Sequence, residues 1–355
     1  MNAIDARIEG GNPAAPRAVA PATHPTHKFQ LLLKREYWEH KGGFLWAPLV
    51  AGGISLLLTL MAIVLGLIAA RRAIADGDME IDGIQVNGLD IGQLTQRMSA
   101  EDMAEMAQGL DLTLLLSSSW PFIVLAFVVF FYCLGALYDE RKDRSVLFWK
   151  SLPLSDTQTV LSKVVSAAVV APLIAVGAAI ATMFVFMLMI SAVVMLHGGN
   201  PMELIWGPAN PLTIVGGHLA WIPVYALWAL PTIGWLLLCS AWARSKPFLW
   251  AIMVPLFAGI FVSWFDLMEL FNLDSSWFWA NAVGRLLLGT FPAIDMAYRS
   301  GFGENGGEGL ENITRELSAA RHLQTLAMPE LWIGALVGAA MIFGAIRLRR
   351  WRDEG

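Results

Sequence analysis

Six blocks of this sequence are long and apolar enough to cross a membrane, and they leave very few folds open to the chain. A helix needs about 20 residues to cross the ~30 Å hydrocarbon layer. The blocks cover roughly residues 46–70, 119–138, 164–196, 214–241, 247–265 and 329–346. Because backbone polar groups must be paired inside lipid, we predict an all-α integral membrane protein with six transmembrane helices.

The composition agrees with this prediction. Hydrophobic residues make up 56% of the 355 residues and charged residues only 15%, whereas a soluble domain is about 25% charged. The two cysteines, Cys133 and Cys239, lie inside apolar blocks. We expect both to be small buried residues and not part of a disulfide framework.

The distribution of basic residues predicts the orientation of the six spans. If both termini are cytoplasmic, 17 of the 24 Lys and Arg lie on the cytoplasmic side, as the positive-inside rule requires. Arg71 and Arg72, just beyond the first span, would lie on the outer side and oppose this assignment, but the basic residues on the cytoplasmic side outnumber those outside. We therefore expect a multi-pass protein of a bacterial inner (cytoplasmic) membrane with both termini inside.

The flanking segments divide the chain further. Residues 1–26 are polar, rich in Pro and Ala, and lack the apolar core of a signal peptide, so we expect a disordered cytoplasmic tail. A six-span domain covers residues 46–346, and residues 347–355 form a second cytoplasmic tail. Two outer loops are large: 71–118, in which Ser99 is expected to start a short helix, and 266–328, whose piece 282–298 is too short to span and is expected to re-enter the outer leaflet.

Several kinds of chemistry have no signature in the sequence. There is no Gly-x-x-x-x-Gly-Lys-Ser/Thr phosphate loop, and no two of the six histidines pair at metal-ligand spacing within a helix. We therefore predict no catalytic residues, no metal site and no nucleic-acid partner. The spans contain essentially no ionisable residues apart from His218, which argues against an ion-coupled transporter.

A mixed-charge run follows the second span. Asp139 to Lys150 carries seven charges and includes Phe148 and Trp149, and Pro153 follows it. Basic residues alone are enough to stop a segment from entering a membrane, so the interleaved acids and the aromatic pair need another explanation. The composition is typical of a short helix on the membrane surface, which Pro153 would end.

A new helix is predicted to start directly after this corner. Ser155 and Gln158 match a capping box, with Ser155 as the N-cap. The helix is expected to run through Lys163 into the third span as far as about Leu196, with a kink at Pro172. At 1.5 Å per residue it would be about 60 Å long, roughly twice the hydrocarbon thickness.

These motifs resemble the first cytoplasmic loop of ABC-2 type permeases, the six-span membrane subunits of ABC exporters with the type V fold. The resemblance rests on Tyr138-x-Glu140-Arg141-x-Asp143-Arg144-Ser145, then Leu152-Pro153-Leu154-Ser155, then Lys163. Ser145 departs from the pattern, because the family commonly has Gly there. Residues 27–45 resemble the family's amphipathic elbow helix, with Phe29, Leu32, Leu33 and Tyr37 on one side and Lys34, Arg35, Glu39 and Lys41 facing water.

The resemblance implies a permease subunit of an ATP-driven exporter. Segment 139–154 would be the coupling helix that docks on a separate cytoplasmic ABC ATPase, present in two copies, which would bind ATP and Mg. The segment between spans five and six would supply outer re-entrant helices. A second permease chain, more readily an identical copy than a related one, would complete the path through the bilayer.

The expected coupling residues are Glu140, Arg141, Asp143, Arg144, Phe148, Trp149, Pro153, Ser155 and Lys163. Arg141 and Arg144 would pair with acids of the ATPase, and Phe148 or Trp149 would anchor in its groove. The alternative is a non-transporting scaffold or sensor whose outer acidic loops bind a partner. That class predicts no ATPase partner. A membrane-embedded enzyme is disfavoured, because no polar constellation lies at membrane depth.

Overall fold

The computed structural model describes residues 25–75, 80–81, 84–85, 99–145, 154–268, 274–292 and 318–351. The first half contains α1 (Pro25–Glu39), the π-helical turn η1 (Gly42–Trp46), α2 (Ala47–Ala75), β1 (Glu80–Ile81), β2 (Ile84–Gln85), α4 (Ala100–Gly135), α5 (Tyr138–Lys142), α7 (Asp156–Val165), the π-helical turn η2 (Ser166–Val170) and α8 (Ala171–Leu196). The second half contains η3 (Met202–Trp206), α9 (Pro211–Trp228), α10 (Leu230–Trp242), α11 (Pro247–Leu267), α12 (Ser275–Phe278), η4 (Trp279–Gly284), α13 (Arg285–Leu288), α16 (Ala319–Thr325) and α17 (Pro329–Trp351).

The expected helical membrane architecture is confirmed at this level. Five helices are long and apolar enough to cross a membrane, and the bent pair α9 and α10 makes a sixth candidate. Each of these helices covers one of the six apolar blocks. The chain is therefore an all-α, multi-pass membrane protein.

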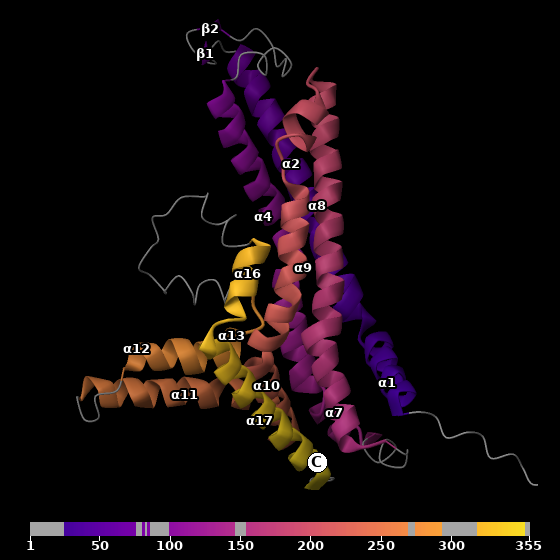
Figure 1. The fold of residues 1–355 in the computed structure, drawn as a ribbon, viewed down its shortest axis with the longest axis vertical. Helices are drawn as coiled ribbons and strands as arrows, with labels where there is room; N and C mark the ends of the chain where they lie inside the picture. The colour runs from indigo at the N-terminus through magenta and orange to yellow at the C-terminus, as the bar shows by residue number, and fades with distance from the viewer. Residues whose placement is uncertain are drawn as a thin grey trace, which may run out of the picture.

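The core of the bundle lies between α4, α8, α9 and α10. Helices α2, α4, α8 and α9 run along the longest axis of the molecule (Figure 1). Buried side chains of α4 such as Leu125 and Val129 pack with Ala175 of α8 and Leu237 of α10. Cys133 and Cys239 belong to this core and are free thiols, as expected. In contrast, α2 exposes most of its apolar side chains, as a helix that faces lipid does.

The helix that starts at Ser99 is longer than expected. Ser99 caps it through a reciprocal capping box with Asp102, but the helix then continues without a break through the second apolar block to Gly135. The predicted short helix of the outer loop is therefore the first part of α4. The described part of the loop before it is a two-stranded antiparallel pair, in which Glu80 lies opposite Gln85 and Ile81 opposite Ile84.

The predicted long helix into the third span is confirmed. Asp156 to Leu196 forms a continuous 41-residue helical run made of α7, η2 and α8. The π-helical turn η2 ends at Val170, and Pro172 follows in the first turn of α8. Proline has no backbone N–H, and the first turn of a helix does not use this group for a hydrogen bond within the helix. The wider turn thus accommodates the proline inside a continuous helix.

The fourth block is broken in the middle, which the sequence analysis did not predict. Helices α9 and α10 meet at Ala229 with a bend of 47°, and Pro231 stands in the first turn of α10. The bend brings α10 against α17 so closely that their backbones touch. A Cβ on Gly234 would lie 2.6 Å from the carbonyl oxygen of Gly338, and one on Gly338 would lie 2.5 Å from the carbonyl carbon of Leu230.

The fifth block forms a helix that runs across the bundle and not along it. In Figure 1, α11 projects sideways from the bundle, and α12 returns beside it. The start of α11 contacts the other long helices, for example through Phe248 stacked on Phe131 and through the Ala251 carbonyl, which accepts from Trp235. Before it, Lys246 has a left-handed backbone (φ 48°) and Pro247 starts the helix. The chain therefore turns sharply out of α10.

The segment after α11 is helical where it is described. Residues 275–288 form a continuous helical stretch of α12, η4 and α13. Trp279 lies so close to Gly259 of α11 that a Cβ there would clash with its ring, and its indole N–H donates to Ser263. Residues 1–24 of the expected tail, residues 76–79, 82–83 and 86–98 of loop 71–118, and residues 293–317 and 352–355 lie outside the described residues.

Candidate functional site: a buried ion-pair network

Helix α1 presents a carboxylate to the bundle. Leu32, Glu36, His40 and Phe44 recur at every fourth residue and therefore share one face. Leu32 is 4% exposed, and Glu36 and Phe44 are 0% exposed. The expected apolar face of the elbow helix thus contains a fully buried acid, Glu36, that the sequence analysis did not identify.

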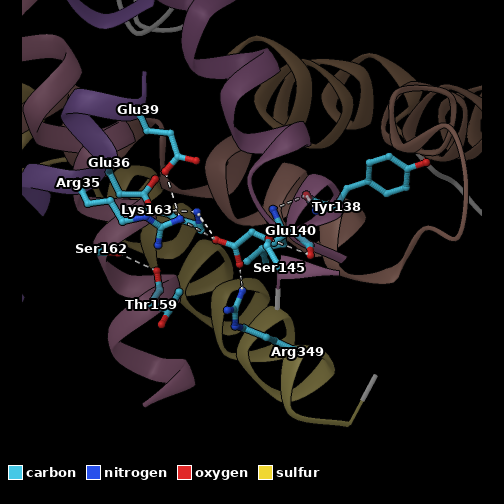
Figure 2. Close-up of polar contacts among 12 residues, drawn as sticks. Arg35, Glu36, Glu39, Tyr138, Glu140, Ser145, Thr159, Ser162, Lys163 and Arg349 are labelled. Atoms are coloured by element: carbon cyan, nitrogen blue, oxygen red, sulfur yellow. Dashed lines mark hydrogen bonds and ion pairs between the residues drawn. The ribbon is translucent and has the colours of Figure 1, made fainter. Parts of the chain in front are cut away.

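Two groups from different helices hold the Glu36 carboxylate. The ammonium group of Lys163 in α7 lies 3.0 Å from Oε1, and the Tyr132 hydroxyl of α4 donates to Oε2 at 2.8 Å. Lys163 is itself buried, at 2% exposed. One carboxylate therefore connects α1, α4 and α7, as Figure 2 shows for Glu36 and Lys163.

Glu140 of the mixed-charge run is the second centre of this network. Its Oε1 lies 3.0 Å from the Lys163 ammonium and 3.9 Å from Arg35, and its Oε2 accepts from the Arg349 guanidinium of α17. Arg349 also contacts Asp156 at 3.2 Å. We call Glu36, Glu140, Asp156, Lys163 and Arg349 the charged node. Figure 2 labels four of them, Glu36, Glu140, Lys163 and Arg349.

The charges of the node balance when its neighbour Arg35 is included: three acids face three cations. Balance matters because a buried charge left without a partner costs several kcal/mol. The node joins α1, α5, α7 and α17, and its directly paired residues are up to 209 positions apart in the chain. We call the part of the bundle where these four elements meet the charged end.

Arg141 is also buried, but it serves a different purpose. Its guanidinium donates to the carbonyl oxygens of Ser240 at 2.6 Å and Ala243 at 2.8 Å, in the last turn of α10. Carbonyls at a helix C-terminus lack partners within the helix and attract cations. The Ser240 hydroxyl accepts in return from the backbone N–H groups of Leu137 and Tyr138. The start of the run is therefore fixed to the end of α10.

The next residues of the run turn outward. Asp143 and Arg144 are exposed, and the Ser145 hydroxyl donates to the Glu140 carbonyl at 3.2 Å. Arg144 has a left-handed backbone with φ 55°, a conformation that strains every residue except glycine. Phe148, Trp149 and Pro153 lie outside the described residues.

Ser155 lies where the capping box predicted it. Its hydroxyl accepts from the Gln158 N–H at 3.1 Å, and the Gln158 side chain accepts from the Ser155 N–H at 3.3 Å. The cap sets the first turn of α7, which contains Asp156, the partner of Arg349. The predicted Ser155 cap is thereby confirmed.

The expected coupling residues therefore separate into two groups. Glu140, Arg141 and Lys163 are buried in contacts within the chain, whereas Asp143 and Arg144 are exposed. The sequence analysis missed the other members of the network: Glu36, Tyr132, Asp156 and Arg349. A signal for Glu36 was present, because an acid at the Leu32–Phe44 spacing stands on the apolar face of an amphipathic helix. Arg349 gave no such signal, since it stands among other arginines that end α17.

An open cavity of about 720 Å³ adjoins the node. It lies between α1 and η1 on one side and α4 and α5 on the other, and Glu140 and Lys163 form part of its wall. Among the described residues, no group of three or more His, Cys, Asp or Glu side chains is arranged to hold a metal ion. The node consists of paired ions, which position helices and leave no free nucleophile.

Comparisons with protein-family models, with curated proteins and with solved structures find no match for this chain.

Proposed function

We propose that this chain is the permease subunit of an ATP-driven ABC exporter, coupled at its charged end to a separate cytoplasmic ATPase. The observation that carries the proposal is the position of Glu140 in the charged node. The residue belongs to the mixed-charge run that resembles a coupling helix, and it is ion-paired to both the long α7–α8 helix and α17. A force on that run would therefore reach several membrane helices at once.

The path of transmission runs through paired charges. Moving α5 relative to α7 would separate Glu140 from Lys163, which are 3.0 Å apart and buried. Because separating buried partners costs several kcal/mol, the elements move together when pushed. Since α7 continues into α8 without a break, displacement of Lys163 becomes displacement of the third span.

The buried and exposed residues of the run take different roles in this proposal. Glu140, Arg141 and Lys163 transmit movement inside the chain. Arg144, on the exposed outer side of the run, would pair with an acid of the ATPase. Phe148, Trp149 and Pro153, of segment 139–154, remain proposed anchor and corner residues on the strength of the family resemblance.

Assembly follows from the same proposal. Two copies of the ATPase, each holding ATP and Mg, would act on two permease chains, with a homodimer as the simplest arrangement. The charged end would face the cytoplasm of a bacterial inner membrane, as the basic residues predict. The outer segment 275–288 would be part of the re-entrant region of the family.

Co-purification tests the class of protein. The tagged chain is extracted from membranes of its own host in mild detergent, and the proteins bound to it are identified by mass spectrometry. We expect an ABC ATPase at a stoichiometry of one per permease chain. A scaffold or sensor predicts other partners and no ATPase, and that outcome would contradict the proposal.

A charge reversal tests where the ATPase docks. Arg144→Glu changes an exposed residue outside the charged node, so the fold is retained while pairing with an acidic partner is lost. We expect at least about a fivefold loss of ATPase association, the effect of a contact worth about 1 kcal/mol. Arg350→Glu, exposed at the same end on α17, is the matched control and retains association. Equal association of both variants would refute docking at this run.

A further inference from the structure

One wall of the cavity beside the node changes character along its length. Phe127, Phe131, Gly135, Asp139 and Asp143 stand at every fourth residue, and all five line the cavity. The wall thus passes from two aromatic rings through a glycine to two carboxylates. Phe127 is 50% exposed and Phe131 is 57% exposed, so their rings offer apolar contact surface to a bound molecule.

Gly135 keeps the middle of this wall open. An added Cβ at that position would lie 2.6 Å from Oδ2 of Asp139. The Asp139 carboxylate therefore lies back against α4, close to the aromatic part of the wall. A side chain at residue 135 would both displace that carboxylate and fill the space between it and the Phe131 ring.

The charges around the cavity favour a cation. The two basic side chains of its wall already have acidic partners: Lys163 pairs with Glu36 and Glu140, and Arg35 with Glu39 at 3.1 Å. Asp139 and Asp143 are exposed and form no ion pair within the described part of the chain. The exposed carboxylates of Asp139 and Asp143 therefore lie at one end of the cavity, and the aromatic rings of Phe127 and Phe131 lie at the other.

We propose that this cavity binds a lipophilic organic cation, with its charge near Asp139 and Asp143 and its apolar part against Phe127 and Phe131. The volume of about 720 Å³ lies in the range of small-molecule sites. Aromatic faces also attract organic cations directly, which an inorganic ion with a tight water shell does not exploit. The proposal names a substrate class for the permease, and in that respect it rests on the proposed function.

Two ions of the same shape and opposite charge test the site. Binding of tetraphenylphosphonium and of tetraphenylborate is measured by equilibrium dialysis on the purified full-length chain in nanodiscs of zwitterionic lipid, corrected for empty nanodiscs. We expect saturable binding of the cation and none of the anion. Equal binding of the two ions would show nonspecific partition and overturn the proposal.

Variants locate the bound cation. Asp139→Asn with Asp143→Asn is expected to weaken cation binding about tenfold, as loss of two exposed charge contacts does. The matched control, Glu101→Gln with Glu105→Gln, removes two exposed acids from the far end of α4 and leaves binding unchanged. Gly135→Leu, which places a side chain in the middle of the cavity and displaces the Asp139 carboxylate, is expected to abolish binding while the chain stays monodisperse. If the Asp139 and Asp143 variant binds like the control, the cation is not in this cavity.

The assay separates this proposal from the proposed function. It uses the permease chain alone, without ATPase or nucleotide. Cation binding without a co-purified ATPase would support the cavity and contradict the exporter. An ATPase partner without cation binding would do the reverse.

Discussion

The two ends of α17 are held in opposite ways. Near its start, Gly334 and Gly338 form a Gly-x-x-x-Gly stretch, and the backbone of α17 touches that of α10. At its last turn, Arg349 is held by the side chains of Glu140 and Asp156. One attachment thus depends on the absence of side chains, and the other depends on two long charged ones.

The difference reflects the surroundings of the two ends. Inside lipid there is no hydrophobic free energy to gain when an apolar side chain exchanges lipid contacts for contacts with another helix. Helices there associate through close packing of small residues. Beyond the apolar blocks, charges are tolerated, and buried ion pairs fix which partners meet. Packing therefore determines how closely α17 approaches, while the node determines which elements its end contacts.

A charged side chain, Arg285, also packs against the close-packed end of α17, at Gly334. The Arg285 guanidinium occupies the space where a Cβ of Gly334 would stand, and it donates to the carbonyls of Glu330 and Leu331. It also stacks over the Trp228 ring at 4.2 Å. These contacts with backbone carbonyls and an aromatic face tie α13 to α17.

Gly338→Leu is expected to have the largest effect. Its side chain would meet the backbone of Leu230 and Pro231, which has no rotamer to change. The helices would have to separate, and α10 and α17 share the core. We expect loss of monodisperse protein in size-exclusion chromatography. Gly344→Leu, which would meet only the flexible Leu238 side chain, is the matched control and keeps the monodisperse peak.

Arg349→Ala comes next. It leaves Glu140 buried with Lys163 as its main partner, and loss of one member of a buried ion pair destabilises by about 3–5 kcal/mol. Unfolding in mixed micelles of increasing SDS fraction measures the change in the free energy of unfolding. Arg347→Ala, whose guanidinium only covers the Phe343 ring, controls for loss of charge at this end. An unchanged free energy for Arg349→Ala would show that the node does not hold α17.

A paired replacement sharpens the same comparison. Glu140→Leu with Arg349→Leu removes both charges and fills their volume, so Glu140 is no longer a buried acid without its cation. Asp156, which is partly exposed, still loses its contact with Arg349. We expect this double variant to be more stable than Arg349→Ala alone, because replacing a buried ion pair by apolar side chains of similar volume is often neutral. Lys163 still pairs with Glu36. If the double variant is the less stable of the two, the node contributes net binding energy and not only specificity.

Ser155→Ala should have the smallest effect. The cap orients the first turn of α7, in which Asp156 meets Arg349, and loss of a serine N-cap costs about 1 kcal/mol. The same unfolding assay measures it. Ser99→Ala removes the equivalent cap of α4 far from the node, and a similar loss is expected there. Any excess for Ser155→Ala over Ser99→Ala gives the contribution of the cap to the node.

The sequence predicted features that depend on local patterns. The six apolar blocks, the Ser155 cap and the continuous helix from Asp156 to Leu196 all follow from periodicity and capping residues. The bend at Ala229 and the sideways course of α11 could not be predicted in this way. Helices α9 and α11 are both strongly apolar, so hydropathy identifies them as membrane spans but does not predict how they are oriented relative to the rest of the bundle.

The candidate site was predicted only in part, for a related reason. The mixed-charge run was recognised as unusual, but its acids and bases were taken to face outward. The partners of Glu140 are 23 residues away in Lys163 and 209 residues away in Arg349. Pairs at such separations leave no period in the sequence. Only the fold brings Glu36, Glu140 and Arg349 to the same end of the bundle.

The separation of Glu140 from Arg349 also has a consequence during synthesis. At about 5–20 residues per second, the ribosome takes about 10–40 seconds to add the 209 residues between them. Lys163 is synthesised soon after Glu140 and can pair with it early, whereas Arg349 becomes available only when α17 has been made. The node can close only after the final helix has entered with its arginine on the correct side. The ion pairs of Arg349 with Glu140 and Asp156 therefore form only when α17 is inserted in the correct orientation relative to the earlier helices.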